Sequence, residues 1–134
     1  MKAVRTALCA VFAVLALTAS TASTAHASAA PEPTCAVLAP YDFECVFVGV
    51  VKGRVFLDPV AQRATTQVYL GHSLFGWQKV AEATWPRSRV QAATCGTAFN
   101  HTACLYTDFN WSERFVSLRA TYDEREIGNW RFTW

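Results

Sequence analysis

Few residues in this sequence have types and spacing that could carry chemistry. His72 and Ser73 are adjacent, but neighbouring residues of an extended chain point to opposite sides, and no G-x-S-x-G motif surrounds the serine. A serine-based catalytic triad is therefore not expected. After the first 30 residues the imidazoles are limited to His72 and His101, whereas zinc normally takes several protein ligands. The sequence thus predicts no metal site and no cofactor.

Carboxylates are the other candidate catalytic groups, because glycoside hydrolysis needs a pair of them. An enzyme would require a pocket on which two or more of a set of six side chains converge, namely Asp42, Glu44, Glu82, His72, His101 and Asp108. Nothing in the spacing selects such a set from Asp42, Glu44, Glu82, Asp108 and Glu113. We therefore expect a protein that is not an enzyme, and a small carboxylate-dependent hydrolase is the least favoured alternative.

The cysteines after residue 30 form two close pairs in the sequence. An even number of cysteines is typical of a disulfide framework in an oxidising compartment, although four cysteines allow three pairings. We favour the two local disulfides, while a link from Cys45 to Cys104 across two sheets stays open. The local pairs are Cys35 with Cys45 and Cys95 with Cys104.

The segment from Cys95 to Cys104 is polar and reads as a disulfide-closed hairpin or corner. A closed loop of this kind is suited to presenting side chains to a partner. Its candidate binding residues are Phe99, Asn100 and His101.

Aromatic residues exceed what one small core must contain. Exposed rings commonly stack on sugars or anchor a protein partner. Trp111 lies between Asn110 and Ser112 in a predicted turn and is expected to be exposed, so it is the fourth candidate binding residue. Aromatic residues in predicted strands are expected to pack in the core, namely Trp77, Trp130 and Phe132.

The amino terminus has the pattern of a secretory signal peptide. Lys2 and Arg5 precede an apolar run over 7–17, and Ala25-His26-Ala27 fits a signal-peptidase site. The apolar run is shorter than the roughly 18 residues that span a bilayer, so the mature chain is expected to have no membrane span. The predicted organisation is a signal peptide at 1–27, a flexible leader at 28–34 and one domain at 35–134.

Processing would leave a neutral chain. The 12 basic residues include Lys2 and Arg5, so the mature chain would carry 10 basic and 10 acidic residues. Binding of a phosphate backbone needs several cations on one surface, and the basic residues here are scattered. Nucleic acid is therefore not expected as a partner.

Short alternating segments predict an all-β fold of seven or eight strands. A buried strand is expected over 44–51, followed by a turn at Lys52-Gly53, and further strands are expected up to Trp134. The spacing of turns favours a single small antiparallel β-sandwich, immunoglobulin-like or with a similar Greek-key connectivity, and a small barrel stays open.

The chain resembles small exported proteins of actinomycete-type bacteria, most of them uncharacterised. The resemblance rests on the two cysteine pairs, the Gln-Val-Tyr-Leu segment at 67–70 and the Gly-Trp-Gln-Lys-Val-Ala segment at 76–81. The cysteine pairs are also similar to those of the neocarzinostatin-like chromophore-binding apoproteins, which are immunoglobulin-like sandwiches. Here the first pair lies near the amino terminus rather than mid-chain, so chromophore binding does not carry over.

Together these observations predict a secreted, disulfide-stabilised, non-catalytic binding or interaction protein. Its partner is expected to be an extracellular protein or a glycan. An inhibitor of a secreted hydrolase is the main alternative, and a purely structural envelope role is a third.

Overall fold

Nine β-strands and no helix make up residues 31–134, the part of the chain described by this computed structural model. No helix in this part could cross a membrane. The predicted signal peptide and the first residues of the leader lie outside the described residues. Thr34, assigned to the leader, already pairs with Val46. The strands are β1 (Thr34–Ala39), β2 (Asp42–Phe47), β3 (Val51–Asp58), β4 (Arg63–His72), β5 (Gly76–Pro86), β6 (Gln91–Ala98), β7 (His101–Asn110), β8 (Phe115–Tyr122) and β9 (Arg125–Thr133).

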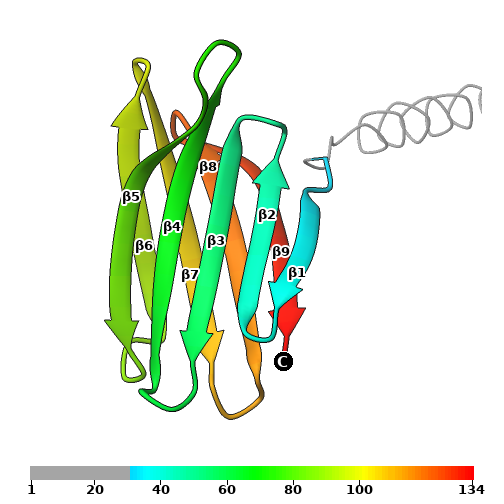
Figure 1. The fold of residues 1–134 in the computed structure, drawn as a ribbon, viewed down its shortest axis with the longest axis vertical. Coiled ribbons are helices and arrows are strands. Elements are labelled where there is room, and N and C mark those ends of the chain that lie inside the picture. Colours follow the sequence, from blue (N-terminus) through cyan, green and yellow to red (C-terminus); the bar gives the residue numbers. More distant parts are fainter. Residues whose placement is uncertain (1–30) are drawn as a thin grey trace, which may run out of the picture.

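The strands form two antiparallel sheets in simple sequence order. β1 to β5 make a five-stranded sheet, and β6 to β9 make a four-stranded sheet (Figure 1). The all-β class and the two antiparallel sheets are confirmed. The Greek-key or immunoglobulin-like connectivity is wrong, because within each sheet the strands lie in the order of the sequence, and only β5 and β6 are successive strands that do not pair. A Greek key needs a longer connection that returns a strand beside the first, and the connections here are only a few residues long.

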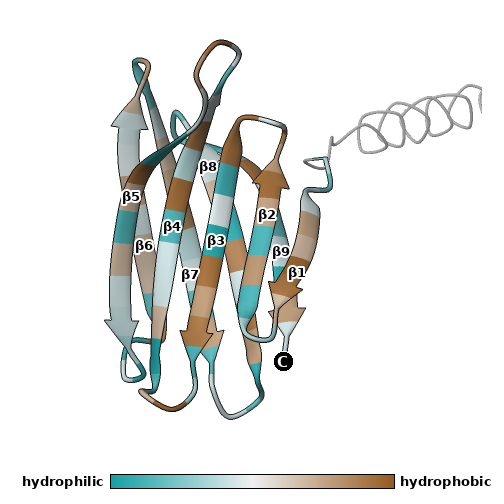
Figure 2. Ribbon diagram, viewed as in Figure 1, coloured by the Kyte–Doolittle hydropathy of each residue, from teal (hydrophilic) through white to brown (hydrophobic). Residues whose placement is uncertain are grey.

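One hydrophobic core lies between the two sheets. Residues alternate between buried and more exposed along β2, β3, β4 and β7, as expected for strands with one face toward a core. Phe43 of β2 stacks on Phe132 of β9 with ring centroids 4.7 Å apart, which joins the two sheets. Figure 2 shows the resulting alternation of brown and teal along β3 and β4.

A buried polar contact joins the sheets near the β5–β6 side. The hydroxyls of Thr66 on β4 and Thr94 on β6 share a hydrogen bond of 2.6 Å, and both residues are buried. The indole N–H of Trp85 also donates to Thr66 at 3.0 Å. Because buried hydroxyls are costly when unpaired, this arrangement satisfies the polar atoms that the core contains here.

Both disulfides have the predicted local pairing, Cys35–Cys45 and Cys95–Cys104. Each joins residues directly opposite one another in a sheet. Cys45 is fully buried in the core, whereas Cys95 is exposed on the outer surface of the other sheet. The first disulfide therefore fastens the edge strand β1, and the second fastens the edge strand β6.

Gly53 lies inside β3, so the predicted turn at Lys52-Gly53 is wrong. The chain turns at Val48–Val50 instead, and Lys52 pairs with Tyr69 in the sheet. A Cβ atom at residue 53 would lie 2.8 Å from Cδ1 of Leu105 on the opposite sheet. Glycine is needed here for the close approach of the sheets and not for a bend.

Candidate functional site

Four connections gather at one end of the molecule, which we call the loop end. They are the β2–β3, β4–β5, β6–β7 and β8–β9 connections, at residues 48–50, 73–75, 99–100 and 123–124 (Figure 1). Every second connection of an antiparallel meander emerges at the same end, so this gathering follows from the topology. The loop end contains three of the four binding residues predicted from the sequence.

The predicted disulfide-closed hairpin is present, with a tight turn at its tip. Phe99 and Asn100 form the turn with φ of 55° and 64°, and His101 begins β7. Positive φ at both central residues is the geometry that matches the twist of a two-residue hairpin. Asn100 is exposed, whereas Phe99 and His101 are half-buried. The Cys95–Cys104 bond lies below this turn and limits opening of the hairpin.

Phe99 meets residues from the other sheet. Its ring lies 4.4 Å from that of His72 at the end of β4, and 6.0 Å from that of Phe75 in the β4–β5 loop. The rings of His72 and Phe75 are 4.9 Å apart. These three residues form an aromatic cluster that bridges the two sheets. The cluster borders a hollow of about 230 Å³ that His101 and Tyr122 also line.

His72 organises the β4–β5 loop. Its Nδ1 accepts a hydrogen bond of 3.0 Å from the backbone N–H of Leu74, and the N–H of Phe75 lies 3.4 Å away. An imidazole nitrogen that accepts is unprotonated, so this geometry corresponds to the neutral ring with its proton on Nε2. The same residue lines a second hollow of about 400 Å³ beside Trp77. His72 thus acts as a structural acceptor within the loop.

His101 and Asp123 connect the β6–β7 and β8–β9 turns. Nδ1 of His101 lies 2.6 Å from Oδ2 of Asp123, and the backbone N–H of Thr102 donates to Oδ1 at 2.9 Å. The hydrogen bond from Thr102, followed by the one from His101, lowers the pKa of the Asp123 carboxyl. The imidazole also stacks on Tyr122 at 4.8 Å, and burial raises the pKa of that phenol.

Large apolar side chains are exposed on the loops of this end. Leu74 is 82% exposed and Phe75 is 64% exposed in the β4–β5 loop, and Val48 is 52% exposed in the β2–β3 loop. Figure 2 shows brown segments on both loops. Grouped apolar side chains in contact with water are typical of a surface that binds another molecule.

Trp111 lies at the opposite end, and the prediction that it is exposed is wrong. It is half-buried against the core and meets Trp134 edge to face, with ring centroids 5.7 Å apart. Its Nε1 is buried and, among residues 31–134, has no hydrogen-bond partner. The β7–β8 loop therefore turns the indole inward instead of presenting it to solvent.

Two of the three strand aromatics also depart from their predicted core positions. Trp77 and Trp130 are each 37% exposed, because both belong to the edge strands β5 and β9. Phe132 is buried as predicted. Alternation of apolar and polar residues along a strand shows which side chains share a face. It does not show whether the opposite sheet covers that face at a given residue.

The candidate catalytic carboxylates of the strands are divided between the outer surfaces of the two sheets. Asp42, Glu44 and Glu82 belong to the outer surface of the five-stranded sheet, whereas Asp108 is on the outer surface of the four-stranded sheet. Asp42 accepts two hydrogen bonds from Arg54, at 3.0 and 2.8 Å. Within residues 31–134, no three His, Cys, Asp or Glu side chains are grouped as metal ligands.

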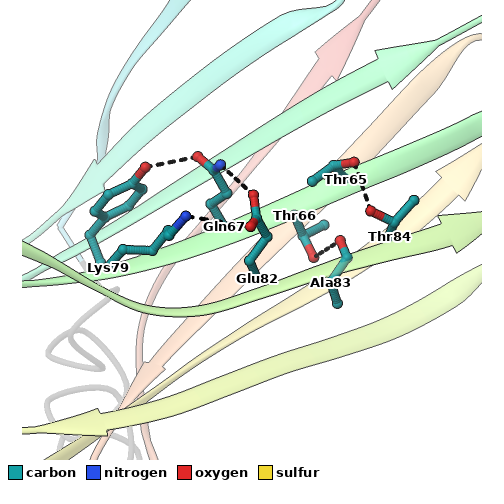
Figure 3. Close-up of polar contacts among 8 residues, drawn as sticks. Thr65, Thr66, Gln67, Lys79, Glu82, Ala83 and Thr84 are labelled. Atoms are coloured by element: carbon teal, nitrogen blue, oxygen red, sulfur yellow. Dashed lines mark hydrogen bonds and ion pairs between the residues drawn. The ribbon is translucent and has the colours of Figure 1, made fainter.

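Polar side chains on the outer surface of β4 and β5 are bonded to one another. Gln67 donates to Glu82 at 2.7 Å and accepts from the hydroxyl of Tyr69 at 2.8 Å, while Lys79 lies 3.4 Å from Glu82. Figure 3 shows Gln67 and Lys79 directed at Glu82. The hydrogen bond from Gln67, and then Lys79, lower the pKa of the Glu82 carboxyl. These groups already have partners within the protein.

No protein-family model, curated protein or solved structure matches this chain. The resemblance to exported actinomycete-type proteins therefore stays a prediction, and the candidate site rests on the geometry of this chain alone.

Sequence reasoning missed three members of the loop-end site, namely His72 as a loop organiser, Phe75 and Asp123. The positions of the loops in the sequence could have identified these residues, because the loops after every second strand of a meander lie at the same end of the sheet. Use of these positions required the connectivity of the strands, which the sequence did not reveal.

Proposed function

We propose that this protein is a secreted, non-catalytic binding protein that contacts a partner protein through its loop end. The observation that carries the proposal is the exposed pair Leu74 and Phe75, on a β4–β5 loop that is held by a hydrogen bond to His72 and by the packing of Phe75 against Phe99. Burying an exposed leucine and phenylalanine contributes about 1.5 to 3 kcal/mol per side chain, so a partner with an apolar recess would gain substantially.

Preorganisation supports binding by this surface. The β4–β5 loop is held by His72, and the neighbouring β6–β7 turn is held by a disulfide and by the bond between His101 and Asp123. A loop that is ordered before binding loses less conformational entropy in the complex. An interaction role therefore agrees with the way these loops are fastened.

Secretion is part of the proposal. Two intramolecular disulfides are compatible with an oxidising extracellular compartment, and the amino-terminal sequence has the pattern of a signal peptide. The non-catalytic part of the proposal is supported by the carboxylates alone, because Asp42, Glu44, Glu82 and Asp108 lie on the outer surfaces of the sheets, away from the loop-end hollow that His72 and His101 both line. Mass spectrometry of the culture supernatant should detect a chain that begins near residue 28.

Inhibition of a secreted hydrolase is a second candidate, favoured by the shape of the β4–β5 loop. In Figure 1 this loop reaches beyond the β2–β3 loop, and its tip carries Leu74 and Phe75. A projecting apolar tip suits insertion into the cleft of an enzyme. The purified protein would then inhibit one or more secreted proteases or glycosidases, and a Leu74→Ser/Phe75→Ser variant would inhibit them less.

The general proposal is tested by capture. Proteins from concentrated culture supernatant are passed over the immobilised protein and over the Leu74→Ser/Phe75→Ser variant. A species that is retained by the first and released by the second supports the loop end as the contact surface. Equal retention by both would place the contact elsewhere, and no retention by either would argue against a binding role.

A further inference from the structure

A hollow lies on the outer surface of the four-stranded sheet, away from the loop end. Its volume is about 500 Å³, and its lining comes from β6, β7, β8 and β9 together with Arg89 of the β5–β6 loop. Two rows of residues cross the sheet here. Gln91, Asp108 and Ser117 are paired in one row, and Ala93, Tyr106, Arg119 and Asn129 are paired in the next.

The hollow exists because a small side chain stands beside large ones. Ala93 on the edge strand β6 is paired with Tyr106, and Tyr106 is paired with Arg119. Because the Ala93 side chain is small, a hollow remains there, and neighbouring polar side chains border it. Arg89 closes one side, and its backbone N–H is fixed by a 2.9 Å hydrogen bond to the carbonyl of Pro86.

Polar groups in this hollow are available to a ligand. Gln91, Asp108 and Asn129 are exposed, and their side chains make no hydrogen bond to any residue within 31–134. This differs from the outer surface of the other sheet, where Gln67 and Glu82 are bonded to one another. An amide supplies both donors and acceptors and a carboxylate supplies acceptors, which is the mixture that hydroxyl groups require.

Arg119 is positioned for a planar anionic group. Its guanidinium lies over the Tyr106 ring, 4.2 Å from the centroid, and its Nε forms a long ion pair of 3.8 Å with Oε1 of Glu126. Stacking fixes the plane of the guanidinium while leaving N–H groups available at its edge. Arginine held in this way recognises a carboxylate by two parallel hydrogen bonds.

The two arginines make the hollow suited to an acidic ligand. Arg89 and Arg119 line it with one carboxylate, Asp108, while Glu126 lies outside the lining and pairs only with Nε of Arg119. A polyphosphate backbone needs more cations than these, and Asp108 would repel it. Four strands at a spacing of about 4.8 Å span about 14 Å, which accommodates several linked sugars in a row.

We propose that this hollow binds an acidic oligosaccharide, a chain of sugars that carry carboxylates, as uronic acids do. Arg119 and Arg89 bind the carboxylates, and Asp108, Gln91 and Asn129 bind the ring hydroxyls. This site goes beyond the proposed function, because it lies on a different surface and takes a different class of ligand. It gives a secreted binding protein a means of attachment to acidic polysaccharide while the loop end stays free.

The test is titration of the purified protein with a galacturonic acid hexamer, followed by calorimetry and by NMR of backbone amides. Saturable binding with shifts at Ala93, Tyr106 and Arg119 is expected. Arg119→Gln should weaken binding by roughly tenfold or more, since it removes a charge-assisted bidentate contact. Arg63→Gln, the same charge change outside the hollow, should leave the affinity unchanged.

Further variants and a neutral control ligand distinguish this proposal from its alternatives. Asp108→Asn keeps the size of the side chain and should alter affinity, and the Leu74→Ser/Phe75→Ser variant should bind the hexamer like the wild type. Near-ultraviolet circular dichroism confirms that each variant is folded. The proposal is overturned if the hexamer causes no saturable shifts, if a neutral glucose hexamer binds equally well, or if Arg119→Gln binds as tightly as Arg63→Gln.

Discussion

The rings of Phe75 and Phe99 lie parallel, with an interplanar angle of 1° and centroids 6.0 Å apart, although the two residues lie in connections of different sheets. His72 contacts both rings. The β4–β5 loop and the β6–β7 turn are therefore coupled at the loop end. Movement of the β4–β5 loop would therefore shift the β6–β7 turn, and the reverse. The exposed side chains of the loop end thus form one surface.

Replacing Phe99 with glycine tests the balance between backbone strain and ring packing in the turn. A left-handed φ costs a residue with a Cβ about 1 to 2 kcal/mol, and Phe99 has φ of 55°. Glycine removes that cost while losing the contact with His72. The free energy of unfolding in urea should change by less than about 1 kcal/mol. A loss above about 3 kcal/mol would show that the Phe99 ring belongs to the core.

Truncation of Phe43 tests the contact between the two sheets. Phe43 is fully buried and stacks on Phe132, so Phe43→Ala should cost about 3 to 5 kcal/mol of unfolding free energy. Phe56→Ala is the matched control, because Phe56 is only half-buried on the outer surface beneath Arg54. Equal losses for the two variants would contradict a core located between the sheets.

Removal of the second disulfide should weaken the loop end more than the remainder of the fold. In the chain-entropy model a closed loop of this length contributes about 2.5 to 3 kcal/mol, so Cys95→Ala/Cys104→Ala should lose about that amount. The far-ultraviolet spectrum should stay that of a β protein, because Cys35–Cys45 and the core are unchanged. Binding of the partner should weaken, because Phe99 of the hairpin packs beside Phe75 of the contact loop, and unchanged binding would show that the contact loop does not depend on the hairpin.

The Asp123 carboxyl should titrate below the ordinary aspartate value of about 3.9. Its pKa is lowered first by the backbone N–H of Thr102 and second by His101. A lowered pKa in the folded state means that the carboxylate stabilises the fold above the ordinary pKa, and that this stabilisation is lost as the pH falls through the lowered value. The carboxyl ¹³C shift of Asp123 reports the midpoint directly.

His101→Phe separates the two causes of that shift. Because the Thr102 hydrogen bond is the larger cause, the midpoint of Asp123 in this variant should rise only part of the way toward the ordinary value. A full return would mean that His101, and not the backbone of Thr102, dominates the interaction.

Much of the fold could be predicted because the alternation of apolar and polar residues that marks a strand can be recognised within a short segment of sequence. The all-β class follows from the alternating segments, and both disulfides follow from close cysteine pairs. The segment around Gly53 was misassigned because glycine serves turns and close approaches alike, and only the contact with Leu105 distinguishes them. The Greek-key expectation failed because periodicity does not specify which strand neighbours which.

The loop-end site could be predicted only in part. The hairpin with Phe99 and His101 was visible as a cysteine-bounded polar segment, whereas His72 and Phe75 lie more than 20 residues away in the sequence. Trp111 was misplaced because a tryptophan in a short turn can fold back against a neighbour, here Trp134. Such contacts depend on the relative placement of the sheets, which no local pattern contains.

The central claim, that the loop end is the partner-binding surface, is tested most directly by comparing the dissociation constants of three forms for the captured partner. They are the wild type, Leu74→Ser/Phe75→Ser, and Val60→Ser/Val90→Ser, whose valines are exposed on connections at the opposite end. All three should be equally stable, within about 0.5 kcal/mol. We predict that the loop-end variant binds at least about tenfold more weakly while the control variant binds like the wild type. Unchanged binding by the loop-end variant, or an equal loss in the control, would contradict the claim.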